Sequence, residues 1–111
     1  MNYQHPGLAA GKWKTFSFLD QMGNVGSEIS RAIHWRRNDQ LRSNEAFERS
    51  LELLDMTIED SKNKSKLKEL CLLREMLADH FYFDNEYASS DQGWDDYFYN
   101  FAYASAVVKG Y

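Results

Sequence analysis

The chain has 111 residues, of which 43% are hydrophobic and 15% aromatic, which is enough for one globular domain and too little for two. The net charge of −4 argues against a general polyanion binder, and the single cysteine excludes an intramolecular disulfide and a cysteine-based zinc site. No apolar run approaches the ~20 residues that span a bilayer, and no signal-peptide core is evident. We therefore expect a cytoplasmic protein without membrane contact.

Residues 1–12 contain the only proline, Pro6, together with Gly7 and Gly11, and show no hydrophobic period. This composition predicts a flexible N-terminal tail. Trp13 is expected to begin the packed domain, which then covers residues 13–111.

The first predicted helix covers residues 15–37, with Thr15 as its N-cap. Its apolar positions recur every three or four residues and share one face: Leu19, Met22, Gly26, Ile29 and Ile33. Gly23 and Gly26 each cost about 1 kcal/mol inside a helix. We interpret them as positions where a neighbouring element packs closely, since no strand precedes them to form a phosphate-binding loop.

The next two predicted helices cover residues 44–59 and 66–83, separated by a polar break at 61–65. Ser43 is the expected N-cap of the earlier one. Their inward positions are predicted to be Phe47, Leu51, Leu54 and Ile58, followed by Leu67, Leu70, Leu73, Leu77 and Phe81. Cys71 lies in this apolar stretch, and we expect a buried, unreactive thiol.

The last predicted helix covers residues 90–108, with Ser89 and Gln92 spaced as a capping box. Its expected inward residues are Trp94, Tyr97, Phe98, Phe101, Ala104 and Val108. Tyr99, Tyr103 and Val107 leave it almost no polar face, and a helix that is apolar all round is usually covered on more than one side. The pattern predicts self-association, with Trp94, Tyr97, Tyr99 and Tyr103 as interface candidates.

Four amphipathic helices joined by short breaks predict an all-α, four-helix, up-and-down antiparallel bundle. This topology gathers lysines at one end, and the run Lys62, Lys64, Lys66 and Lys68 is a candidate anion-binding site. Ordinary surface solubility explains the same lysines. The other end combines four arginines near the first turn with four acids near the last loop, and we expect these opposite charges to pair or lie close: Arg31, Arg36, Arg37 and Arg42 with Asp79, Asp84, Glu86 and Asp91.

Metal and cofactor sites are not predicted. Helical di-metal sites need Glu-x-x-His pairs on two helices, and the chain has none. A metal-binding or small-molecule-binding bundle is therefore the weakest of the functional classes that we consider.

One segment carries a catalytic pattern: Arg74 and His80 are separated by five residues, and Tyr82 follows. A histidine can remove the proton of a ribose 2′-hydroxyl while an arginine stabilises the charge that develops on the phosphate. Six residues on a regular helix place the two side chains about 120° apart, so they converge only across a bend or a dimer axis.

This segment resembles the Arg-x(4–6)-His motif of the HEPN nucleases, small helical-bundle proteins that act as dimers. It also looks like the His-x-Tyr extension of HEPN toxins that are paired with a nucleotidyltransferase antitoxin. The resemblance implies that Arg74 and His80 are catalytic, that Tyr82 is modified by the partner and that RNA is the substrate. Glu75 departs from the family, in which a small polar residue often follows the arginine.

The sequence favours a non-enzymatic, self-associating interaction or accessory module, in a nucleic-acid-related or toxin–antitoxin-type system. The alternative is a HEPN-like, metal-independent ribonuclease that uses Arg74 and His80.

Overall fold

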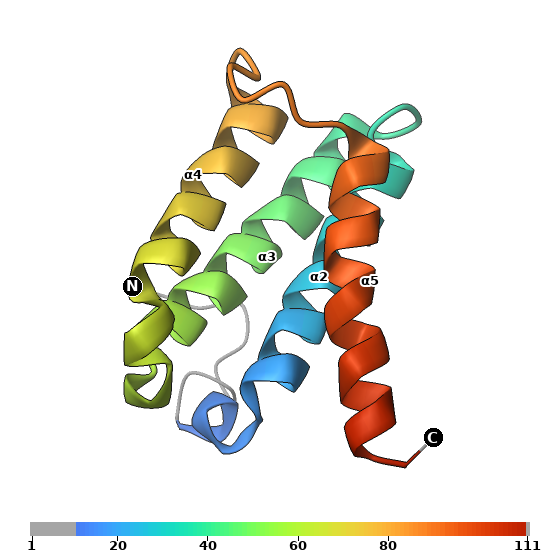
Figure 1. The fold of residues 1–111 in the computed structure, drawn as a ribbon. Helices are drawn as coiled ribbons and strands as arrows, with labels where there is room; N and C mark the ends of the chain where they lie inside the picture. Colours follow the sequence, from blue (N-terminus) through green and yellow to red (C-terminus); the bar gives the residue numbers. More distant parts are fainter. Residues whose placement is uncertain (1–10, 111) are drawn as a thin grey trace.

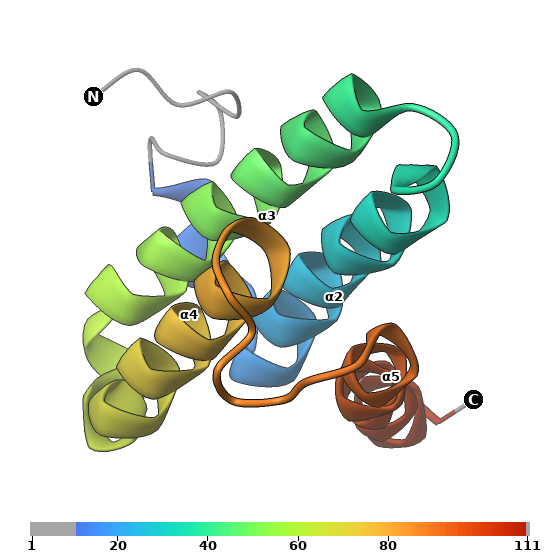
Figure 2. The ribbon, with the colours of Figure 1, turned by 90° about the horizontal axis from the view of Figure 1, so that it is seen from above.

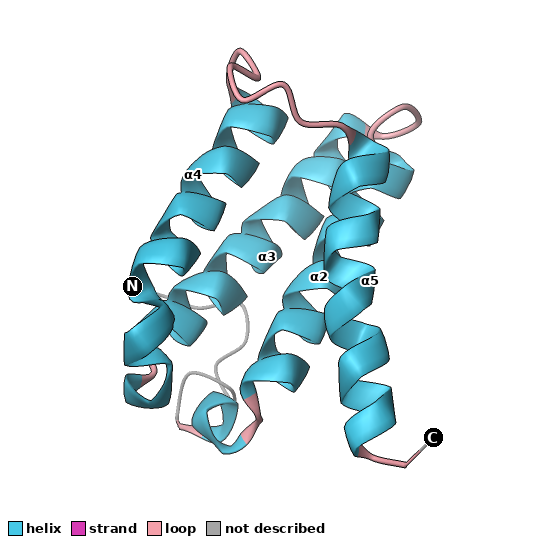
Figure 3. Cartoon of the chain, in the orientation of Figure 1, coloured by secondary structure: helices cyan, strands magenta, loops and turns pink. Residues whose placement is uncertain are grey.

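The computed structural model describes residues 11–110, which fold into four α-helices and two short 3-10 helices (Figures 1 and 3). In chain order these are η1 (Lys12–Thr15), α2 (Phe18–Trp35), α3 (Gln40–Glu59), η2 (Ser61–Lys66), α4 (Leu67–Tyr82) and α5 (Asp91–Val108). Successive helices run in opposite directions, and no strand occurs among the described residues. The prediction of an all-α, four-helix, up-and-down fold is confirmed.

The helices pack in the spatial order α4, α3, α2, α5, so that α2 and α3 are the central pair (Figure 2). α5 packs against α2, and α4 packs against α3. Two of the three packed pairs therefore join helices that follow one another in the chain, whereas α2 and α5 come from its two ends.

The core lies between these helices and is built mostly from the predicted apolar stripes. Its most fully buried large side chains include Met22 and Ile29 of α2, Phe47 and Leu54 of α3 and Leu77 of α4. Buried aromatic and aliphatic side chains of this size each contribute roughly 1.5–3 kcal/mol to the free energy of folding. Apolar burial thus stabilises the central helix pair.

Gly26 lets α5 approach α2 closely. A Cβ atom at Gly26 would lie 2.6 Å from the Cβ of Phe98, a separation that real side chains do not tolerate. Gly23, one turn earlier, has no atom within 4 Å of the same position. The prediction that a neighbouring element packs closely is therefore confirmed for Gly26. At Gly23 no described part of the same chain packs closely.

Three predicted helix caps are wrong. Ser17 caps α2 instead of Thr15, which ends η1. Asp39 caps α3 by accepting the Arg42 backbone N–H, whereas Ser43 is buried and donates its hydroxyl to the Ala32 carbonyl. Ser90 caps α5 instead of Ser89, accepting the backbone N–H of Gly93. In each case another polar residue within a few positions has the extended backbone conformation that capping needs.

A buried polar network closes the base of the fold. Gln21 donates to the Trp13 carbonyl and to Asp60, and Asn63 donates to Gln21 and to the Thr57 carbonyl. The Trp13 indole N–H donates to the Thr57 hydroxyl at 3.0 Å. These bonds satisfy polar groups that lie out of contact with water, and they tie η1 and η2 to α2 and α3.

Several expected burials are wrong. Cys71, Leu67, Tyr97 and Val108 are exposed, Val108 to 77% of its surface. The reason is the open helix order, since α4 and α5 each pack along one neighbouring helix and leave wide outer faces. Of the predicted tail, residues 1–10 lie outside the described residues, and Lys12 already belongs to η1.

Candidate functional site

Arg74 projects from α4 toward α3 and forms a two-point ion pair with Asp55. Its Nε lies 2.7 Å from one carboxylate oxygen, and its Nη2 lies 3.3 Å from the other. The hydrogen bond that Arg74 donates to Asp55 raises the pKa of the guanidinium, and the negative charge of Asp55 acts in the same direction. In the folded monomer this guanidinium is occupied by a structural partner.

His80 lies in the last turn of α4 and is buried. Its Nε2 lies 2.8 Å from a carboxylate oxygen of Asp91 and 3.1 Å from Nη1 of Arg36. Arg36 also donates to the His80 carbonyl and contacts Asp91 at 3.0 Å, and its guanidinium lies over the Phe81 ring. These contacts form a junction between the C-terminal ends of α2 and α4 and the start of α5.

The two residues of the catalytic motif therefore have different partners within one chain. The arginine that meets His80 is Arg36, which is 44 residues away in the sequence. The charge layout of the sequence placed Arg36 and Asp91 at this end, but it gave no signal that His80 joins them. Ribonuclease activity stays a prediction, and a ribonuclease assay of the folded protein with its His80→Ala and Arg74→Ala variants tests it.

Tyr82, the predicted modification residue, lies at the end of α4 with 43% of its surface exposed. Its ring meets Phe47 edge-on, with ring centres 4.8 Å apart. Partial burial and the neighbouring Glu48 carboxylate raise the pKa of its hydroxyl. The side chain is partly exposed, and its hydroxyl is protonated at neutral pH.

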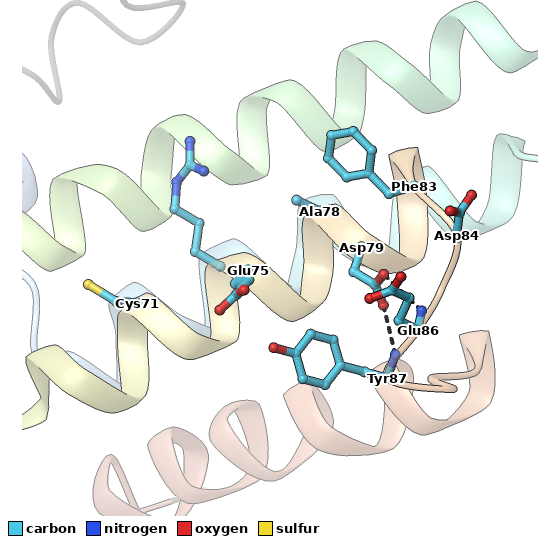
Figure 4. A pocket seen from close by; sticks show the side chains of 9 residues that line it. Cys71, Glu75, Ala78, Asp79, Phe83, Asp84, Glu86 and Tyr87 are labelled. Carbon is cyan, nitrogen blue, oxygen red and sulfur yellow. Dashed lines mark hydrogen bonds between the residues drawn. The ribbon is translucent and has the colours of Figure 1, made fainter.

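A hollow of about 620 Å³ lies on the outer side of α4 beside the loop that follows it (Figure 4). Four carboxylates line it: Glu75, Asp79, Asp84 and Glu86. Asp79 is committed to structure, because its oxygens accept the backbone N–H groups of Glu86 and Tyr87. The Glu75 carboxylate raises the pKa of the Tyr87 hydroxyl beside it. Acidic side chains outnumber the single arginine, Arg74, that also lines the hollow, and one of the four carboxylates, Asp79, fixes the loop.

The predicted anion-binding lysines lie at the base of the fold, in η2 and the first turn of α4. Lys62 is held by Asp60 and by the Lys14 carbonyl, and the Lys66 ammonium lies over the Phe18 ring. Lys64 and Lys68 are exposed. Half of the run therefore supports local structure, and none of the four lysines lines the acidic hollow beside α4.

The four predicted interface residues divide into two pairs. Trp94 is 6% exposed and belongs to the core, and Tyr97 packs its ring against Phe98 while remaining 39% exposed. Tyr99 and Tyr103 project from the outer face of α5, 65% and 61% exposed, with stacked rings 6.3 Å apart. Val107 continues the row one turn later, 55% exposed. We call Tyr99, Tyr103 and Val107 the α5 ridge.

A shallow groove runs beside this ridge, between α2 and α5. It consists of two adjoining hollows of about 310 and 290 Å³ that share Gly23, Ser27 and Ala102. Asp95 lines one end and Lys109 lines the other. We call it the α2–α5 groove. Sequence reasoning missed it, because pairing α5 with α2 could not be read from the helix periods.

Comparisons gave no match to any protein-family model, curated protein or solved structure. Among residues 11–110, no group of three or more His, Cys, Asp or Glu side chains is arranged to hold a metal ion. No helix in the described range is long and apolar enough to cross a membrane.

Proposed function

We propose that this protein is an interaction module that self-associates through the outer face of α5. The observation that carries the proposal is the α5 ridge, a row of two stacked tyrosines and a valine that are more than half exposed on one helix face. Tyrosine is enriched among the residues that dominate binding energy, because its ring buries a large area at a small cost in side-chain entropy.

The surroundings of the ridge support the same proposal. The base of the fold carries lysines and the α4 hollow carries carboxylates, whereas the middle of α5 bears no charged side chain between Asp96 and Lys109. Depletion of charge around exposed aromatic side chains is the compositional feature of an interface centre. A face of this kind is suited to a second protein surface rather than to a small substrate.

Sedimentation velocity over a range of protein concentrations tests the proposal. We expect the wild type to shift from monomer to dimer, and the Tyr99→Glu/Tyr103→Glu variant to remain monomeric, because burying two carboxylates opposes association. Leu41→Glu is the matched control, since Leu41 is 75% exposed but lies in the first turn of α3. Circular dichroism checks that each variant folds. A wild type that stays monomeric throughout, or a tyrosine variant that still dimerises, overturns the proposal.

A further inference from the structure

The α5 ridge and the α2–α5 groove lie side by side, since Tyr99 of the ridge also lines the groove. The ridge is convex and aromatic, whereas the centre of the groove is lined by the small residues Gly23, Ser27 and Ala102. A surface that carries a ridge beside a parallel groove can fit a second copy of itself. The two copies are then related by a two-fold axis between ridge and groove, and each ridge fills the groove of the other.

Resting on the self-association proposed above, we propose that the partner is a second copy of this chain docked antiparallel along α5. The ridge of each copy enters the α2–α5 groove of the other. The two-fold axis passes close to Ala102 and is perpendicular to α5. Each copy contributes one ridge and one groove. Both are used within the dimer, so no third copy can be added through the same surface.

Charge decides between the antiparallel and the parallel arrangement. Asp95 and Lys109 stand at opposite ends of the groove, 14 residues and about 21 Å of helix apart. In a parallel pairing the Asp95 carboxylates of the two copies face each other, and their negative charges repel. The antiparallel pairing sets Asp95 against the partner's Lys109, and it also aligns the helix dipoles favourably.

Lys109 can form a second ion pair, with Asp95 of the partner copy. Within its own chain it forms an ion pair with Asp20 at 2.9 Å, and its side chain is still 51% exposed. An ammonium group has three donors and can bind two carboxylates at once. The intramolecular pair therefore positions Lys109 at the rim of the groove.

Gly23 provides an independent sign that the groove receives an outside group. A glycine in mid-helix costs about 1 kcal/mol relative to alanine, and at Gly26 the close approach of Phe98 explains that cost. At Gly23 the space above the backbone is empty within 4 Å. A side chain from a second copy occupying that space accounts for a glycine that intramolecular packing does not require.

The size of the surface predicts a weak dimer. Two helices about 10 Å wide over the length of α5 give a footprint of roughly 500 Å² per copy. Interfaces of this area lie at the lower end of the specific range. We therefore expect dissociation in the micromolar range rather than an obligate dimer.

Cysteine cross-linking tests the arrangement in a Cys71→Ser background, with diamide as the oxidant. Residue 102 lies near the proposed axis. Ala102→Cys is therefore expected to form a disulfide between the two copies, because the proposed arrangement brings the two Cα atoms of residue 102 within bonding range. A mixture of Asp95→Cys and Lys109→Cys proteins is expected to cross-link to each other and not to themselves. Leu41→Cys, exposed on α3, is the control that should stay uncross-linked.

Gly23→Leu tests whether the groove is filled. The variant should fold about as stably as the wild type, because a Cβ at this position has no atom of its own chain within 4 Å and leucine favours the helix over glycine, but it should weaken dimerisation about tenfold or more. Dimerisation that is unchanged in Gly23→Leu, or self-cross-linking of Asp95→Cys, overturns the antiparallel dimer. A sample that sediments as a dimer without the Ala102→Cys disulfide overturns this arrangement alone, whereas a monomeric wild type overturns the proposed function as well.

Discussion

Arg36 joins three helices through a single guanidinium group. It reaches the side chain and carbonyl of His80 on α4 and the carboxylate of Asp91 on α5 from its own position at the end of α2. The side chain is 29% exposed, so its charge is partly screened but its hydrogen bonds are directional. The junction is thus a structural contact, and it holds the two outer helices at the end where the connecting loop joins them.

Removing Arg36 should therefore destabilise the fold more than removing a surface arginine. Arg36→Ala is expected to lower the free energy of unfolding by about 1–3 kcal/mol, because it leaves a buried histidine and a carboxylate short of hydrogen bonds. Arg31→Ala is the control, since Arg31 is 61% exposed and its partner Glu28 keeps a second contact with Arg49. Urea unfolding of the two variants measures the difference, and equal effects would contradict the role of the junction.

The two glycines of α2 should respond to alanine with opposite signs. Gly26→Ala forces a Cβ into Phe98 and is expected to cost about 1–3 kcal/mol of stability through overpacking. Gly23→Ala meets open space and should stabilise the helix by about 0.5–1 kcal/mol. Thermal unfolding of the two variants provides the comparison. A shift in the same direction for both would contradict the packing described here.

At the scale of elements, η2 connects α3 to α4 and also supplies the base of the core. Asp60, buried between η2 and α3, accepts from Gln21 and from both the side chain and the backbone of Lys62. Burial by itself raises the pKa of this carboxyl, but the hydrogen bonds and the Lys62 charge outweigh burial, and the pKa is lowered below its usual value. The short helix is therefore held by an ionised group.

This lowered pKa predicts a loss of stability in acid. A carboxyl whose pKa is lower in the folded state contributes its stability above the unfolded value near pH 4, and the contribution is lost as the pH falls through the folded value. The stability advantage of the wild type over Asp60→Asn should be largest at neutral pH and should shrink below about pH 4. Urea unfolding of both proteins across this range measures it, and a constant difference would show that the charge of Asp60 has no such role.

At the scale of the whole molecule, the helices are held unequally. α2 has seven buried positions and packs along both α3 and α5, whereas α4 has four and packs along α3, meeting α2 and α5 only at its C-terminal end. The outer face of α4 exposes Leu67, Cys71 and Leu72. Local opening of a helix is governed by the apolar contacts that it must break, so α4 requires less free energy to open than α2.

Native-state hydrogen exchange should reveal this inequality. We expect the amides in the middle of α4 to exchange faster than those in the middle of α2, measured by mass spectrometry of peptic fragments under conditions where the protein stays folded. Arg74→Ala, which removes the ion pair with Asp55, should speed the exchange of α4 further while leaving α2 nearly unchanged. Equal protection of the two helices would contradict the open order of the bundle.

The sequence predicts the helices well and their contacts poorly, for physical reasons that particular residues make clear. Met22, Ile29, Leu54 and Leu77 repeat with the helical period, so burial on one face follows from local chemistry. The partners of His80 cannot be predicted from local chemistry, because Arg36 and Asp91 belong to other parts of the chain and meet His80 only through tertiary packing. The α5 ridge could be predicted, because the last helix has more apolar side chains than one buried face needs. The groove beside the ridge could not be predicted, because it depends on which helix lies next to α5.

The pairing of α2 with α5 also shapes how the chain folds as it is synthesised. α2 and α3, and then α3 and α4, are consecutive in the chain, and their contacts can form over short loops soon after each helix emerges. The flank of α2 around Gly26 stays uncovered until residues 91–108 have left the ribosome, because Phe98 is the side chain that packs against it. The domain therefore completes its folding only after α5 has been synthesised, and until then the side of α2 that Phe98 covers remains exposed.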